Sequence, residues 1–164
     1  MLLFLSPEWL EAVGRNYSSD PNNQNKAFKG LSLVLTFRVL ADPGFGLEKD
    51  VYHSIHWIDG VRQRDSGLLS KADAERKSDF ILAASPGTWK KVIRKETGFV
   101  SAVMTGKVKV EKGAGPEIMA LASKSPVVVD NFNKVDTEWP DEMTPQRLRE
   151  YQAKVAEFRQ RLRV

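Results

Sequence analysis

Apolar and polar residues alternate over residues 31–40, where leucine, phenylalanine and valine take every second position. This period of two predicts a β-strand with one strongly apolar face. A second strand is expected over residues 50–58 and a third over residues 61–68. Asp59-Gly60 links the last two and predicts a β-hairpin, because both residues tolerate positive φ angles.

Three helices are predicted to begin at a hydroxyl residue followed by proline, at Ser6-Pro7, Ser85-Pro86 and Thr144-Pro145. A serine or threonine side chain accepts a hydrogen bond from the first helical turn, and proline fits the first helical position. The other elements are a turn-rich loop over 18–25, a buried strand over 80–84, a short apolar helix over 99–104, an alternating strand over 107–111 and an apolar helix that starts at 115 and is interrupted at 126.

The last predicted helix carries a narrow apolar seam whose members recur at spacings of three and four. These members are Leu148, Tyr151, Val155, Phe158 and Leu162. Residues 144–164 hold six bases and two acids, whereas residues 1–143 are neutral. We therefore expect a domain over 1–133, an acidic linker over 134–143 and a C-terminal amphipathic helix over 144–164. The seam could dock on the domain or pair with a second copy of the chain, and both alternatives stay open.

Composition excludes several classes of function. The chain has 164 residues, of which 41% are hydrophobic and 28% charged, as in a soluble globular domain. It has no cysteine, which excludes disulfides, thiol catalysis and thiolate zinc sites, and its two histidines are too few for most metal chemistry. We expect no cofactor, no nucleic-acid partner and, because no secretion signal or apolar span of about 18 residues is present, a cytoplasmic location.

No stretch of the chain has the pattern of a catalytic site. The glycines at Gly44 and Gly46 lack the remainder of a phosphate-binding loop and indicate a turn. His53 and His56 are three apart in a predicted strand and point to opposite faces, so they cannot share a metal ion. A structural role is the favoured interpretation of both, although either could act alone as a base. Core packing is the favoured interpretation of the tryptophans and phenylalanines, although an aromatic ligand cavity uses the same residue types.

Residues 6–132 resemble the type-2 sterol carrier protein family in the order of their elements. SDFILAASPGTWKKVI is similar to the family's strand followed by a helix that opens at serine. MTGKVKVEKG is similar to its G-K-L-K-V-x-G signature, with one extra residue before Gly113. The resemblance implies an α/β (α+β) fold in which helices cover a five-stranded, largely antiparallel sheet around an apolar tunnel. The C-terminal helix is additional.

The resemblance also implies a function, namely that the domain binds and carries a lipid without covalent chemistry and is not an enzyme. The implied partner is a hydrophobic small molecule such as a fatty acyl chain or a sterol, with transient membrane contact as a further expectation. The implied ligand-binding residues are Trp89, Val92, Ile93, Phe99, Val103, Met104, Ile118, Leu121, Ala122 and Phe132. The alternatives are a ligand-free interaction module that dimerises through the C-terminal helix, and a small enzyme that uses His53 or His56.

Overall fold

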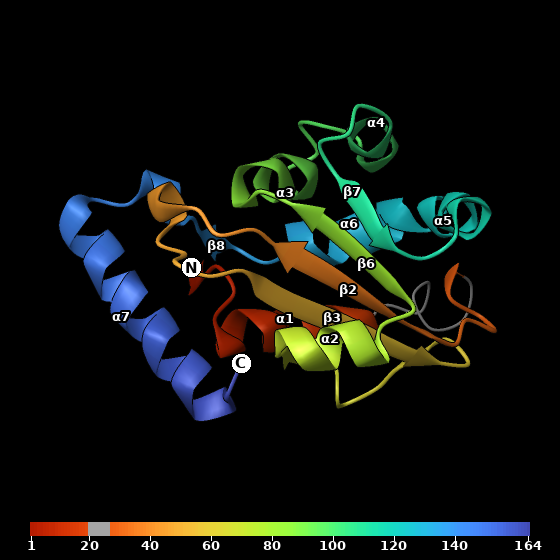
Figure 1. Ribbon diagram of the computed structural model, residues 1–164, viewed down its shortest axis with the longest axis horizontal. Coiled ribbons are helices and arrows are strands. Elements are labelled where there is room, and N and C mark those ends of the chain that lie inside the picture. Colours follow the sequence, from red (N-terminus) through yellow and green to blue (C-terminus); the bar gives the residue numbers. More distant parts are fainter. Residues whose placement is uncertain (20–26) are drawn as a thin grey trace.

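A six-stranded mixed sheet forms the centre of the protein, with helices on both of its faces (Figure 1). The computed structural model describes residues 1–19 and 27–164, so most of the loop expected over 18–25 lies outside the described residues. The strands are β1 (Leu2–Leu3), β2 (Leu33–Val39), β3 (Val51–Ile58), β4 (Val61–Arg62), β5 (Gly67–Leu69), β6 (Phe80–Ala84), β7 (Lys109–Lys112) and β8 (Thr137–Glu138). The helices are α1 (Pro7–Ser19), α2 (Lys71–Lys77), α3 (Pro86–Ile93), α4 (Phe99–Met104), α5 (Gly115–Ala122), α6 (Ser125–Asn133) and α7 (Pro145–Leu162), with short 3₁₀ turns η2 (Pro43–Phe45) and η3 (Pro140–Glu142).

The strand order is β4-β3-β2-β6-β7, and β5 also pairs with β3. The β2–β6 pair is parallel and the other pairs in this sheet are antiparallel, which confirms the predicted fold class. Phe37 at the middle of β2 lies opposite His53 on β3 and Leu82 on β6. Side chains alternate between faces, so these three residues share one face with α1 and α6, while α2 packs on the other (Figure 1).

The Asp59-Gly60 hairpin is confirmed. Ile58 pairs with Val61, and both linking residues have positive φ angles of 49° and 80°. The third predicted strand is interrupted instead of continuous, because residues 63–66 leave the ladder and the Ser66 hydroxyl accepts the His56 amide at 2.9 Å. The two pieces, β4 and β5, both pair with β3, which gives six strands where five were expected.

The predicted helix starts at Ser6, Ser85 and Thr144 are confirmed. Each cap oxygen accepts a hydrogen bond at 3.2 Å from the backbone amide three residues further on. One helix was not predicted as such: the polar stretch over 71–77 forms α2, capped by Ser70, whose hydroxyl accepts the Asp73 amide at 3.1 Å. Ala74 is the one residue of α2 that is buried, so a single small side chain packs this helix on the sheet.

The apolar seam of α7 docks on the domain, which was one of its two expected alternatives. Tyr151, Val155 and Phe158 are buried, and the Tyr151 hydroxyl donates to the Phe4 carbonyl at 2.8 Å. Gly46, which follows η2, packs so closely that an added Cβ would lie 3.0 Å from the Tyr151 ring. The segment 42–47 and α7 therefore pack against each other beside the N-terminal residues.

Residues 134–143, expected to be a linker, are fixed to the domain. Strand β8 pairs in parallel with β1, and Trp139 is buried. The Lys90 ammonium donates to Asp141 at 2.8 Å and to Glu142 at 2.9 Å. Partial burial lowers the pKa of Lys90, but the hydrogen bonds to the two carboxylates raise it more, so the lysine stays charged. This segment thereby connects the N-terminus, α3 and α7.

Candidate ligand cavity

An apolar cavity of about 60 Å³ lies between the sheet and the helices that cover its inner face. Of the described residues that line it, His53 and Ser125 alone are polar. The lining comes from the N-terminal segment and α1 (Phe4, Leu5, Trp9), from the sheet (Leu35, Phe37, Val39, His53, Leu82) and from α3 to α6 (Trp89, Val92, Ile93, Phe99, Leu121, Ser125, Val128, Val129, Phe132).

The cavity approaches the surface between α3, α4 and α6. Most lining residues are fully buried, but Ile93, Phe99, Ser125 and Val129 on these helices are only half-buried. Phe37 is also half-buried although it lies in the middle of the sheet, because the cavity in front of its ring leaves part of it uncovered. The side chains at this end are therefore those that a guest molecule would meet first.

Two tryptophans present an apolar ring face to the cavity while their polar N–H groups point elsewhere. Trp9 donates from Nε1 to the Thr137 hydroxyl at 2.8 Å, and Trp89 donates from Nε1 to the Arg38 carbonyl at 3.2 Å. The Trp9 ring lies 5.6 Å from the Phe132 ring and the Trp89 ring 5.4 Å from the Phe37 ring. Satisfied indole N–H groups and close ring packing fix these walls in position.

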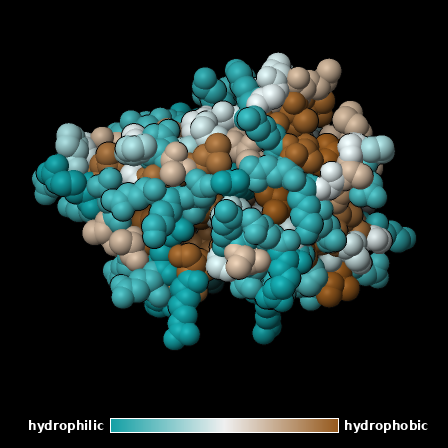
Figure 2. Space-filling view, viewed as in Figure 1, coloured by the Kyte–Doolittle hydropathy of each residue, from teal (hydrophilic) through white to brown (hydrophobic). Residues whose placement is uncertain are grey.

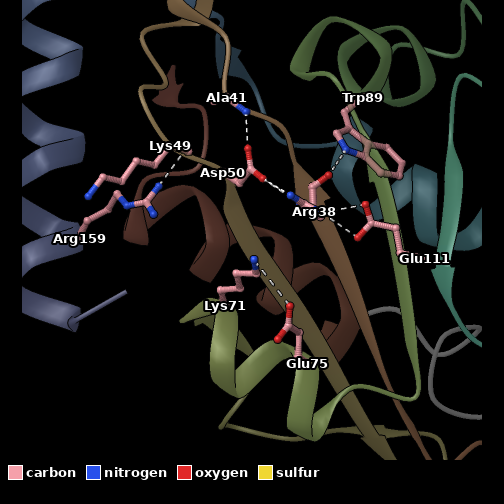
Figure 3. Close-up of polar contacts among 9 residues, drawn as sticks. All are labelled: Arg38, Ala41, Lys49, Asp50, Lys71, Glu75, Trp89, Glu111 and Arg159. Atoms are coloured by element: carbon pink, nitrogen blue, oxygen red, sulfur yellow. Dashed lines mark hydrogen bonds and ion pairs between the residues drawn. The ribbon is translucent and has the colours of Figure 1, made fainter.

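The strand segment below Trp89 is held by an ionic network on the opposite face of the sheet (Figure 3). Arg38 on β2 donates to Asp50 beside β3 and, across β6, to Glu111 on β7 at 2.8 Å. Asp50 also accepts the Ala41 amide at 2.7 Å. Partial burial lowers the pKa of Arg38, but the hydrogen bonds to Glu111 and Asp50 raise it more. The network keeps three strands in register beneath the cavity.

The extra residue in the GKVKVEKG stretch forms a β-bulge. Ile81 pairs with Lys112 and Leu82 with Val110, so Glu111 has no partner of its own in the ladder. The Glu111 carboxylate accepts both of its hydrogen bonds from Arg38 Nη1. The closing Gly113 has a φ angle of 115°, and a Cβ there would lie 2.2 Å from the Phe80 ring, which explains the need for glycine.

Six of the ten residues expected to bind ligand line the cavity: Trp89, Val92, Ile93, Phe99, Leu121 and Phe132. Ile118 and Ala122 are buried in the adjoining core, and Val103 is half-buried against it. Met104 points outward with 80% of its surface exposed. The sequence indicated Phe37 and Val39 only as the apolar face of a strand, and indicated Trp9 only as a residue facing inward.

Three of the helices that line the cavity begin without side-chain caps. Among the described residues, no side chain caps the first turn of α4, α5 or α6, which begin after Gly98, Ala114 and Lys124. A side-chain cap stabilises a helix by about 1 kcal/mol. Helix α6 is held in other ways, because Asn131 accepts from Asn16 at 2.8 Å through its carbonyl. We call helices α4 and α5 the cover.

A crystal structure of sterol carrier protein 2 superimposes on this chain with a TM-score of 0.66, covering 80% of this chain and 98% of the other at 21% identity. The chain has a sterol carrier protein 2 fold. A solution structure from Thermus thermophilus gives a TM-score of 0.69 at 20% identity, and the match covers 84% of this chain and 93% of the other. That structure is of a conserved hypothetical protein whose suggested identity is a sterol carrier protein. A sterol carrier protein domain 2 of Helicoverpa armigera gives 0.52 at 14% identity, with coverages of 75% and 87%.

Comparison with family models and with curated proteins finds no match. At these identities the likeness to solved structures concerns the fold alone, and it confirms the architecture that the resemblance implied. No helix in residues 1–19 and 27–164 has the length and apolar character to cross a bilayer. The same residues contain no cluster of three or more histidine, aspartate or glutamate side chains arranged to hold a metal ion.

Proposed function

We propose that this protein binds a hydrophobic small molecule, such as a fatty acyl chain or a sterol, in its internal cavity and carries it without covalent chemistry. The observation that supports this most is the cavity lining, which is apolar at every described position except His53 and Ser125. Apolar, enclosed pockets with few polar groups are typical of sites for small hydrophobic ligands. The sterol carrier protein 2 fold supports the same interpretation.

The cavity must enlarge to take such a ligand. Its volume of about 60 Å³ is below the roughly 150 Å³ of an apolar cavity that accepts benzene. We propose that the cover moves outward, because α4 and α5 lack side-chain caps and contribute Phe99 and Leu121 to the lining. Burial of roughly 400 Å² of ligand surface gives a gross gain of about 10 kcal/mol. Immobilisation and opening reduce this gain, so we expect micromolar affinity.

The outer surface of the cover supports transient contact with a membrane. Figure 2 shows apolar surface gathered over α4 and α5, where Val100, Met104 and Met119 are exposed. Lys107 and Lys109, both exposed, follow α4 directly. Exposed apolar side chains beside lysines are a combination that favours anionic lipid surfaces. We propose that the cover faces the membrane while the ligand enters or leaves.

Dimerisation through α7 has less support, because the seam that it needs is buried within the chain. Among the described residues of this seam, Leu162 is the only one that is exposed, with 46% of its surface accessible. One such residue is far from the roughly 800 Å² per partner of a stable interface. The cytoplasmic location expected from the sequence stays a prediction.

Ligand binding can be tested with a matched pair of variants on α5. Leu121 lines the cavity and Met119, two residues earlier, is 58% exposed. Leu121→Phe fills space in the cavity, so we expect the affinity for a fluorescent fatty acid to fall about tenfold or more, whereas Met119→Phe should change it less than twofold. Native mass spectrometry of the freshly purified protein should also show bound lipid. A wild-type protein that carries no lipid and binds neither fatty acid, sterol nor acyl-CoA would refute the proposed function.

A further inference from the structure

His53 is a polar residue in the floor of an otherwise apolar cavity. It lies on β3 opposite Phe37 and is 3% exposed. Its ring centroid is 6.5 Å from Trp9, 6.0 Å from Phe37 and 5.8 Å from Phe132. The imidazole is therefore enclosed by aromatic rings from α1, β2 and α6, and its remaining free side is the cavity that it lines.

Within residues 1–19 and 27–164 no hydrogen bond joins the His53 imidazole to another group. The one fully buried polar side-chain atom without a partner there is the Tyr17 hydroxyl, so the His53 ring nitrogens keep a small accessible surface although the residue as a whole is buried. Other buried polar side chains near the sheet are satisfied: Thr36 bonds Ser78 at 2.5 Å, and Ser54 donates to the Gly67 carbonyl at 3.1 Å. Leaving a buried donor and acceptor without partners destabilises a protein, so buried groups of this kind call for an explanation. A leucine would fill the same position on β3 without that penalty.

The electrostatics of the cavity favour an uncharged partner for this ring. Burial lowers the pKa of His53 to about 3, with the positive charge of Arg62 acting in the same direction, so the imidazole is neutral at pH 7. A neutral imidazole has one donor and one acceptor, and a hydroxyl group has the complementary pair. A carboxylate at this depth would be desolvated beside aromatic rings, which is unfavourable without a cation in contact.

We propose that His53 is a hydrogen-bonding subsite for the hydroxyl group of an uncharged, otherwise apolar ligand. The inference rests on the proposed function and adds the chemical class of the guest, namely an alcohol with a hydrocarbon body. His53 lies on the sheet, while the half-buried lining residues that mark the entrance lie on α3, α4 and α6. The ligand would therefore bind with its hydroxyl end inward and its hydrocarbon part beneath the cover.

The subsite can be tested with three ligands that share a ten-carbon chain: 1-decanol, decanoate and n-decane, measured at pH 8. Trp9 and Trp89 line the cavity, so intrinsic tryptophan fluorescence reports occupancy, with native mass spectrometry as a second measurement. We expect wild-type protein to bind decanol more tightly than decanoate. In His53→Leu the ratio of decanol affinity to decane affinity should fall about tenfold, the effect of one lost hydrogen bond.

Two further variants separate the possible outcomes. His53→Gln keeps a donor and an acceptor and should retain part of the preference for decanol, whereas Leu121→Phe should weaken decanol and decane equally. If wild-type protein binds none of the three ligands and also no fluorescent fatty acid, sterol or acyl-CoA, the proposed function is wrong. If it binds one of those lipids but none of the three ten-carbon ligands, the His53 subsite is wrong. If the ten-carbon ligands bind but the ratio is the same in wild type and His53→Leu, or decanoate binds more tightly than decanol, the cavity is confirmed as a lipid site and the His53 subsite is wrong.

Discussion

Burial of a neutral histidine makes the stability of this protein depend on pH in a predictable window. The pKa of His53 is about 3 in the folded protein, because of burial and then of Arg62, against an ordinary value of 6.5 in the unfolded chain. The unfolded chain binds a proton below pH 6.5 while the native imidazole stays neutral. The contribution is therefore fully present above pH 6.5 and is lost as the pH falls toward 3.

The magnitude follows from this difference in proton binding. At pH 5 the unfolded imidazole is almost fully protonated and the native one is not, which lowers the free energy of unfolding by about 2 kcal/mol relative to pH 7.5. Urea unfolding followed by circular dichroism at both pH values measures the effect. For a protein of this size the midpoint should shift by roughly 1 M urea. Most carboxylates titrate below this window, so they contribute little to the difference.

The chain offers a matched control because it has two histidines. His56 is half-buried on β3, opposite Val34 of β2, and its Nδ1 lies 2.9 Å from an Asp65 oxygen. His53→Leu should remove most of the difference between pH 7.5 and pH 5, and His56→Gln should leave most of it. Equal stability of the wild type at both pH values, or an undiminished loss in His53→Leu, would show that the imidazole is not buried in its neutral form.

Two further predictions concern the cover and the C-terminal helix. Met104→Asp places a charge on the exposed apolar surface of α4. Co-sedimentation of the protein with anionic vesicles should then fall several-fold, while its urea midpoint stays unchanged. Equal sedimentation of wild type and variant would contradict membrane contact through the cover. Phe158→Asp buries a charge in the docked seam and should reduce stability by about 3 kcal/mol or more, whereas Leu162→Asp should cost less than about 0.5 kcal/mol. Light scattering should give a monomer mass for the wild type and Leu162→Asp, and a wild-type dimer that Leu162→Asp dissociates would restore the dimerisation hypothesis.

Local patterns predicted most of the elements because their causes are local. A hydroxyl residue before proline starts a helix by satisfying the amide three residues later, as at Ser6, Ser85 and Thr144. The Asp59-Gly60 hairpin needs only two residues that tolerate positive φ. The two pieces β4 and β5 were joined in the prediction, because the interruption depends on the Ser66 hydroxyl, which meets a backbone amide on another strand.

The sequence by itself predicted the strands β2, β3, β6 and β7, the helices capped at Ser6, Ser85 and Thr144, the apolar seam of α7 and, through its resemblance to a known family, the fold. The tertiary structure alone decided which apolar residues meet across the cavity and how much space they leave. Phe37, Trp9 and Phe132 belong to three separate elements, and only packing brings their rings around His53. A strand pattern records which face a residue occupies, whereas the volume left between that face and the helices depends on contacts distant in sequence, and that volume is what a ligand would occupy.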